Sequence, residues 1–256
     1  MQAPANQLPV IAADVLARVR ALSPRVHCIT NAVAQALTAN TLLAVGAVPS
    51  MTIAADEISG FVQRAGALLV NLGTFDAERR MAADIAIDAA NEKNLPWVFD
   101  PVFVDRSAPR AAYAKGLAAR APKAMRLNRA EFIALAGVEP GGDALASYAR
   151  VQSTVVGLTG AIDLVADGER LAVISNGHAL MTRVTALGCA GSALVAACLA
   201  VERDAWQASA VALLIMGVAG ELAAKRARGP GSFAVEILDT LYALDRDMLT
   251  AHAQVS

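Results

Sequence analysis

The sequence ALLVNLGTFDAERRMAADIAIDAANEKNLPWVFDP, residues 67–101, determines the fold class of this chain. It opens with an unbroken apolar run at 67–72, which is typical of a strand buried on both faces of a sheet. The apolar residues of 77–91 repeat with helical spacing, and a second short apolar run follows at 97–99. A strand, a helix and a strand in this order predict a parallel βαβ unit.

The same alternation continues on both sides of this unit. Further strands are predicted at 124–127 and 153–158, with a hairpin formed by 164–166 and 171–174. After an N-terminal arm at 1–9, helices are expected at 11–22, 33–45, 108–119, 129–136, 189–201, 206–225 and 233–247. The pattern predicts an α/β fold in a single domain of 256 residues, with a largely parallel central sheet flanked by helices on both faces.

Composition argues against several classes of protein. The net charge is −1, no Lys/Arg cluster is dense, and aromatic residues make up only 4%, so no nucleic-acid partner is expected. Hydrophobic residues make up 56%, but no apolar run reaches membrane-spanning length. We attribute the surplus to strands buried on both faces and to a large subunit interface. Cys28, Cys189 and Cys198 lack metal-binding spacing, and no secretory signal is evident, so free thiols in the cytoplasm are expected.

Polar or glycine-bearing residues follow the predicted strands. Parallel sheets bind ligands at the carboxyl ends of their strands. The segments in question are Asn71 to Thr74, Asp100-Pro101, Asn128, Thr159-Gly160 and Thr185 to Cys189. Their positions predict that a single cleft lies along one edge of the sheet.

A turn of small residues, 185–192, leads into an apolar helix. Exposed amides at a helix N-terminus favour an anion such as phosphate. The same field is expected to lower the pKa of Cys189 if its thiol points into the cleft. An ordinary helix start with a buried cysteine would give the same pattern.

Other polar residues suggest further contacts. Asp100 and Glu131 together could hold Mg²⁺, mostly through water, although an N-capping Asp and a surface Glu are the simpler interpretation. Arg126 could face a phosphate. Asn31 could hydrogen-bond a small heterocycle, and the Met51 thioether could contact an apolar ring. His27 is interpreted as structural, and the loop at 229–232 either lines a base or joins two helices.

Taken together, these segments resemble hydroxyethylthiazole kinase, a thiamine-salvage enzyme of the ribokinase-like superfamily. The matching segments occur in the family's order over nearly the whole chain. They are VHCITN (26–31), LTANTLLAVGAVPSM (37–51), ALLVNLGT (67–74), FDPV (99–102), RLNRAEF (126–132), LTGAIDLVADG (158–168), NGHALMTRVTALGC (176–189) and GPGSF (229–233).

The resemblance implies a ribokinase-like kinase that transfers the γ-phosphoryl group of ATP to 4-methyl-5-(2-hydroxyethyl)thiazole with Mg²⁺. It also implies a cytoplasmic homotrimer with active sites at subunit interfaces. Cys189 would be catalytic, at the position where other kinases of the superfamily have an aspartate base. By the same resemblance, Asn31, Met51, Ala186 and Gly188 would contact the thiazole alcohol. Arg126, Asn128 and Thr159 would contact ATP. Asp100 and Glu131 would bind the metal.

Three segments depart from the family's pattern. Phe103-Val104 stand where the family has glycines, Leu127 replaces the glycine of an RGN sequence, and Ala186-Leu187 precede Gly188 in the catalytic turn. If the turn requires a positive φ at Ala186, the alanine costs about 1 kcal/mol or more. Three alternatives follow: a related kinase for another small alcohol, a dehydratase of the same superfamily acting on hydrated nicotinamide nucleotide, and a nucleotide-binding relative without activity.

Overall fold

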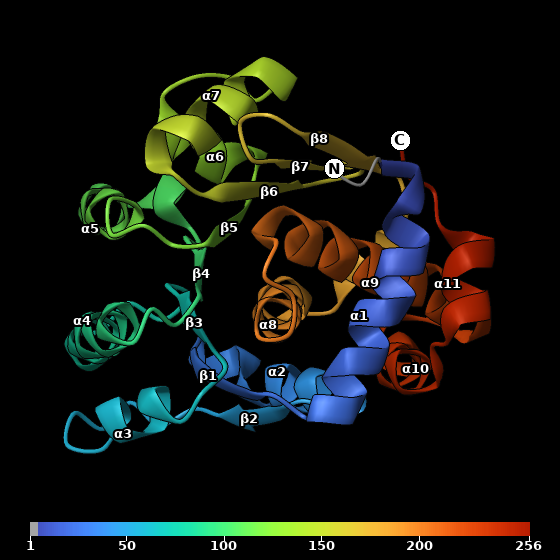
Figure 1. The fold of residues 1–256 in the computed structure, drawn as a ribbon, viewed down its shortest axis with the longest axis horizontal. Helices are drawn as coiled ribbons and strands as arrows, with labels where there is room; N and C mark the ends of the chain where they lie inside the picture. The colour runs from blue at the N-terminus through green and yellow to red at the C-terminus, as the bar shows by residue number, and fades with distance from the viewer. Residues whose placement is uncertain (1–4) are drawn as a thin grey trace.

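A computed structural model describes residues 5–256, through which one eight-stranded sheet runs in the order β2-β1-β3-β4-β5-β6-β7-β8 (Figure 1). The pairs from β2 to β6 are parallel, and β6–β7 and β7–β8 are antiparallel. The strands are β1 (Arg25–Ile29), β2 (Val48–Ser50), β3 (Ala67–Asn71), β4 (Trp97–Asp100), β5 (Ala124–Asn128), β6 (Val155–Thr159), β7 (Asp163–Ala166) and β8 (Leu171–Ile174). The predicted largely parallel sheet is confirmed.

Helices cover both faces of the sheet (Figure 1). On one face lie α3 (Ile58–Gln63), α4 (Ala77–Glu92), α5 (Ala108–Ala118), α6 (Arg129–Ala136) and α7 (Gly142–Gln152). On the other lie α1 (Leu8–Leu22), α2 (Gln35–Ala44), α8 (Leu187–Leu199), α9 (Ala205–Arg226), α10 (Pro230–Ala243) and α11 (Arg246–His252). Residues 5–256 also contain short 3₁₀ turns, namely η1 (Ala5–Gln7), η2 (Ala32–Ala34), η3 (Val104–Arg106) and η4 (Ala179–Arg183).

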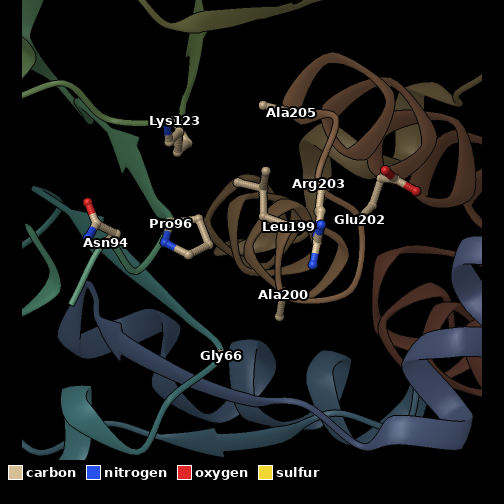
Figure 2. A pocket seen from close by; sticks show the side chains of 9 residues that line it. All are labelled: Gly66, Asn94, Pro96, Lys123, Leu199, Ala200, Glu202, Arg203 and Ala205. Atoms are coloured by element: carbon tan, nitrogen blue, oxygen red, sulfur yellow. The ribbon is translucent and has the colours of Figure 1, made fainter.

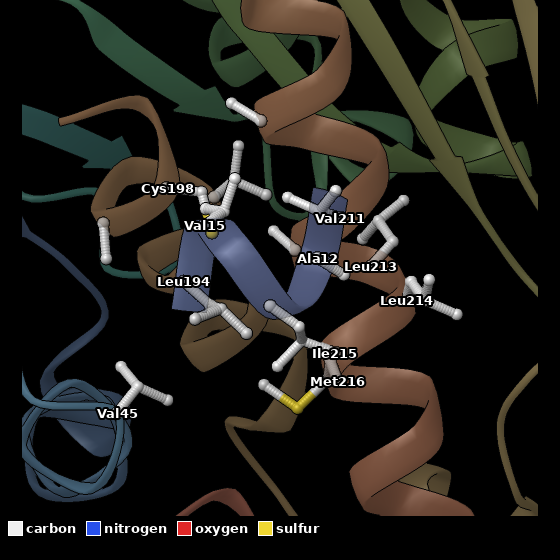
Figure 3. Close-up of a cluster of buried hydrophobic side chains, with 14 of the residues drawn as sticks. Ala12, Val15, Val45, Leu194, Cys198, Val211, Leu213, Leu214, Ile215 and Met216 are labelled. Carbon is white, nitrogen blue, oxygen red and sulfur yellow. The ribbon is translucent and has the colours of Figure 1, made fainter. Parts of the chain in front are cut away.

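The largest apolar core lies between the sheet and helices α1, α8 and α9 (Figure 3). Helix α9 is long and apolar enough to cross a membrane by length and composition, but 78% of its most apolar window is buried within the fold. Strands β3 and β4 are buried at every position. Much of the apolar surplus in the sequence is therefore used inside the chain itself.

Several predicted boundaries were wrong. Helix α1 begins at Leu8, so the predicted arm at 1–9 is incorrect for residues 5–9, and residues 1–4 lie outside the described part. Strand β2 and helices α3 and α7 were not predicted; β2 is three residues long and contains Pro49, which is tolerated at a sheet edge. The helix predicted at 233–247 is two helices, because the Asp245 side chain accepts from Met248 N at 2.8 Å and starts α11.

The turn at 185–189 does not follow a strand, contrary to expectation. It follows η4 and leads directly into α8, whose first helical residue is Leu187. The turn nevertheless lies at the carboxyl edge of the sheet, because Gly188 and Gly191 of α8 pack against the side chain of Arg126 from β5.

His27 links β1 to β2 and is fully buried. Its Nδ1 lies 2.8 Å from Ser50 Oγ, and its Nε2 lies 3.1 Å from the carbonyl oxygen of Thr52. Burial lowers the pKa of His27 to about 4, so the ring is neutral at physiological pH. These contacts agree with the structural interpretation of His27.

Candidate active site

A cavity of about 720 Å³ lies at the carboxyl ends of β5 and β6. One wall is the segment 176–182, the opposite side is formed by β5, β6 and the loop after β6, and the first turn of α8 and the middle of α9 complete it. The lining residues that the sequence had singled out are Arg126, Thr159, Gly160 and Gly188. The predicted convergence of strand ends on one cleft is therefore observed for β5 and β6.

Arg126 is the cation of this cavity. A Cβ atom added to Gly188 would lie 3.4 Å from Arg126 Nη1, and one added to Gly191 would lie 3.4 Å from Nε, so the guanidinium rests on the first turns of α8. Its Nε is buried and has no hydrogen-bond partner within residues 5–256. An unpaired buried donor beside the N-terminus of a helix forms a site that favours an anion.

Asp100 is the last residue of β4, adjacent to the strand that carries Arg126, and it is 3% exposed. Its Oδ2 accepts hydrogen bonds from Asn71 Nδ2 and from Ser192 Oγ, both at 2.7 Å. Burial raises the pKa of Asp100, while the positive charge of Arg126 and the two hydrogen bonds oppose this rise. The carboxylate is thus held by a strand neighbour on one side and by α8 on the other.

Glu131 lies in the first turn of α6 and interacts electrostatically with Asp100. Its Oε1 accepts from Phe103 N at 3.0 Å and its Oε2 from Asn128 N at 2.9 Å. Burial, followed by the charge of Asp100, raises the pKa of Glu131 to about 7. Both carboxyl groups are buried, so the simpler interpretation of a surface Glu does not hold.

Asp100 and Glu131 fit Mg²⁺ only as part of a ligand set that water and phosphate complete. Across residues 5–256, no three His, Cys, Asp or Glu side chains form a group that could hold a metal ion by themselves. Mg²⁺ is commonly held by one or two carboxylates together with water and substrate phosphates. Asp100 and Glu131 suit that arrangement, with most ligands coming from water and phosphate.

Cys189 occupies the first turn of α8 and is 8% exposed. Burial and the nearby charge of Asp100 raise its pKa to about 12, although hydrogen bonding to Asn71 and the charge of Arg126 act in the opposite direction. The expected lowering of this pKa by the helix N-terminus is therefore wrong. The thiol is neutral at physiological pH because its surroundings exclude water.

The turn before α8 has a positive φ at Ala186, the condition under which the sequence implied strain. Ala186 adopts φ 70° and ψ −3°, which is the left-handed region that favours glycine. Phe103, at the second departure from the family's pattern, is also left-handed, with φ 62°. Both backbone conformations are those that glycine would adopt without strain.

Some predicted residues lie away from the cavity. Asn128 uses its side-chain oxygen to cap α6, accepting from Glu131 N at 3.0 Å. Asn31 ends the loop after β1, where its Oδ1 accepts from Val33 N at 3.1 Å and from Thr74 Oγ1 at 3.2 Å. Met51 follows β2 and packs against the main core. Asn31 and Met51 lie on the β1–β2 side of the sheet, beyond the carboxylate pair.

Asn71 and Ser192 were not assigned roles from the sequence. The i, i+3 spacing of Cys189 and Ser192 places both on one face of α8, which was a usable signal. The orientation of Asn71 could not be read from its buried strand, because every position of β3 is buried.

Residues before the amino ends of strands β3, β4 and β5 line a second, smaller hollow of about 250 Å³ (Figure 2). It lies beside the end of α8 opposite to Cys189. Of the site residues predicted from the sequence, none lines it. The larger cavity is therefore the candidate active site.

Known proteins resemble this chain over most of its length. The model of the hydroxyethylthiazole kinase family matches residues 16–247. A probable hydroxyethylthiazole kinase of Agrobacterium fabrum is 43% identical over 95% of this chain and 94% of its own length. The structure of hydroxyethylthiazole kinase protein from Pyrococcus horikoshii is 37% identical, with a TM-score of 0.93 over 96% of this chain and 98% of that one.

A ribokinase-like superfamily protein from Enterococcus faecalis is 13% identical, with a TM-score of 0.66 over 96% of this chain and 92% of that chain. This likeness shows that the two proteins share a fold. The match of the family model over most of the chain, together with relatives more than 40% identical, shows the family directly. The chain belongs to the hydroxyethylthiazole kinase family.

Proposed function

We propose that this chain is an ATP-dependent phosphotransferase that phosphorylates the hydroxyl group of 4-methyl-5-(2-hydroxyethyl)thiazole in thiamine salvage. Membership of the family supports the kinase activity and ATP as co-substrate. The observation that carries the proposal is the unpaired Nε of Arg126, buried beside the first turn of α8 at the edge of the cavity. A phosphate group supplies the acceptors that this donor lacks.

The nucleotide would bind with its phosphates between Arg126 and the N-terminal amides of α8. Thr159 and Gly160 line the same end of the cavity and would contact the nucleotide. Asp100 and Glu131 would hold Mg²⁺ through water, and the bound ion neutralises charge on the phosphates. Asn128 was assigned to ATP from the family pattern, but its side chain is already committed to capping α6, so we propose only a supporting role for it.

The acceptor hydroxyl would lie at the turn before α8, where Ala186, Gly188 and Cys189 meet. Amides of the turn would stabilise the transferring phosphoryl group. Phosphoryl transfer has a loose transition state, so positioning supplies most of the rate enhancement. Removal of the proton from the alcohol is not needed early in the reaction. The thiol of Cys189 is neutral and can accept a proton only in its thiolate form, so Cys189 would assist this step modestly and would form no covalent intermediate.

Asn31 and Met51 would contact the thiazole. They lie next to the edge strand β2, and several apolar side chains on neighbouring segments are exposed, namely Val33 at 69%, Leu43 at 57%, Val48 at 44% and Phe61 at 42%. A surface of this kind supports burial against another copy of the chain. We propose a cytoplasmic homotrimer of single-domain subunits, with the thiazole site completed at the subunit interface.

A second candidate, a kinase for another small alcohol or a weakened relative, is favoured by one observation. Phe103 and Ala186 both hold left-handed conformations where the family pattern has glycine, and Phe103 is 42% exposed. A phenyl ring at this position changes the shape of the surface above Glu131, whose Oε1 accepts the Phe103 amide.

An ADP-release assay over a panel of alcohols tests the proposed function. The panel contains the thiazole alcohol, a hydroxymethylpyrimidine and pyridoxal, each with ATP and Mg²⁺. We expect the highest kcat/KM for the thiazole alcohol. A preference of more than about tenfold for another alcohol, which corresponds to about 1.4 kcal/mol of transition-state binding, would favour the second candidate. Nucleotide binding without turnover of any alcohol would identify an inert relative.

Substitutions at Cys189 test its role. Cys189→Asp should keep or raise activity, because a carboxylate can accept the alcohol's proton, whereas a thiol must first ionise to do so. Cys189→Ala should lower kcat by about one to two orders of magnitude, at the low end for loss of a general base. Both variants should bind nucleotide as the parent does. Complete loss of activity in a folded Cys189→Asp protein would contradict the role.

Substitution of Ala186 by glycine tests the strain in the turn. Ala186→Gly should raise the free energy of unfolding by about 0.5–1 kcal/mol, because glycine adopts the left-handed conformation without the steric cost of a Cβ. The matched control is Ala112→Gly, at an exposed position inside α5, which should lower it by about 1 kcal/mol. Urea denaturation measures both changes. Equal destabilisation by the two substitutions would show that the turn is unstrained.

A further inference from the structure

The wall of the cavity formed by 176–182 rests on helix α9 at very short range. A Cβ atom on Gly217 would lie 2.8 Å from both the Cβ and the carbonyl oxygen of Asn176, and one on Gly220 would overlap the Met181 sulfur. Gly177 N also donates to Glu221 Oε1 at 3.0 Å. The wall is therefore seated directly on the helix backbone, without intervening side chains.

Asn176 begins this wall, but its amide is turned away from the cavity and toward the end of the chain. Its Nδ2 donates to the carbonyl oxygen of His252 at 2.8 Å, and its Oδ1 accepts from Gln254 N at 2.7 Å. The side chain is 5% exposed, and its donor and acceptor are both engaged. Both polar atoms of the Asn176 amide are therefore held by the segment 252–254, one hydrogen bond to each.

Residues 253–256 extend the sheet beside β8. Ser175 N donates to the Gln254 carbonyl at 2.9 Å, and Val173 and Ser256 exchange two backbone hydrogen bonds at 2.8 and 3.0 Å. Gln254 Nε2 adds a longer contact of 3.4 Å to Glu221. The segment therefore binds both the strand that leads into the wall and the first residue of the wall. Within residues 5–256, the lining of the cavity includes none of 253–256.

We propose that Asn176 and residues 252–256 form a clip that positions the nucleotide-facing wall. The clip fixes the point at which the chain leaves β8, so nucleotide affinity depends on a segment that does not contact the nucleotide. The identity of the ligand rests on the proposed function, whereas the positioning rests on the hydrogen bonds alone. Asn176 is a positioning residue in this account.

Proline at position 254 removes the central bond of the clip selectively. Gln254→Pro deletes the N–H that Asn176 accepts and keeps the carbonyl that Ser175 uses. Ala253 has ψ 133°, which suits a residue before proline. Gln254→Ala is the matched control, because it removes the side chain and keeps the backbone N–H.

Calorimetric titration with ADP and with a non-hydrolysable ATP analogue, both with Mg²⁺, measures the effect. We expect Gln254→Pro to weaken binding by about tenfold, because a buried acceptor loses its partner, and Gln254→Ala to bind within about twofold of the parent. KM for ATP should rise in the proline variant while KM for the alcohol stays unchanged. Hydrogen exchange of the amides of 176–182 should become faster in the proline variant alone.

Parental nucleotide affinity and parental exchange in Gln254→Pro would overturn the clip, as would equal losses in the two variants. Should the proline variant not fold, deletion of 254–256 replaces it with the same readouts, and parental affinity there is equally decisive against the clip. If the parent chain binds no nucleotide, the proposed function fails, and exchange of 176–182 decides the clip separately.

Discussion

The guanidinium of Arg126, seated on the first turns of α8, is the interaction on which the site depends. Its charge acts on Asp100, Glu131, Asp163 and Cys189, where burial raises the pKa of each group and Arg126 opposes that rise. Two glycines, Gly188 and Gly191, leave the space that it occupies. Without this cation, the repulsion between the buried carboxyl groups of Asp100 and Glu131 would be stronger, and the cavity would lose the positive charge of Arg126.

The fold brings these groups together from the sheet and from helix α8. Arg126 and Asp100 come from adjacent parallel strands, β5 and β4, whereas Ser192 and Cys189 come from α8 on one face of the sheet. Ser192 and Asn71 then hold the same carboxylate oxygen of Asp100 from opposite directions. A change in the seating of α8 therefore moves the thiol, the carboxylate support and the contact with Arg126 together.

The largely parallel sheet and most of the helices and strands along the chain could be predicted from the sequence, whereas a left-handed Ala186 could be stated only as a condition. Buried strands such as β3 and β4 are recognisable in the sequence as apolar runs. A non-glycine residue at a position that requires a positive φ predicts backbone strain. The short edge strand β2 could not be predicted, because a strand of three residues that includes a proline is too short to show the alternation of apolar and polar residues. The raised pKa of Cys189 depends on burial against Asp100, a contact between segments far apart in the sequence.

The most direct test of the account is a double-mutant cycle between Asp100 and Arg126. Asp100→Asn, Arg126→Gln and the double variant are compared for their affinity for ADP with Mg²⁺. A coupling free energy of about 1–3 kcal/mol is expected, because Asp100 and Arg126 interact electrostatically and substitution of either residue removes that interaction. Losses that add to within about 0.5 kcal/mol would mean that the two groups act independently, and would contradict the account.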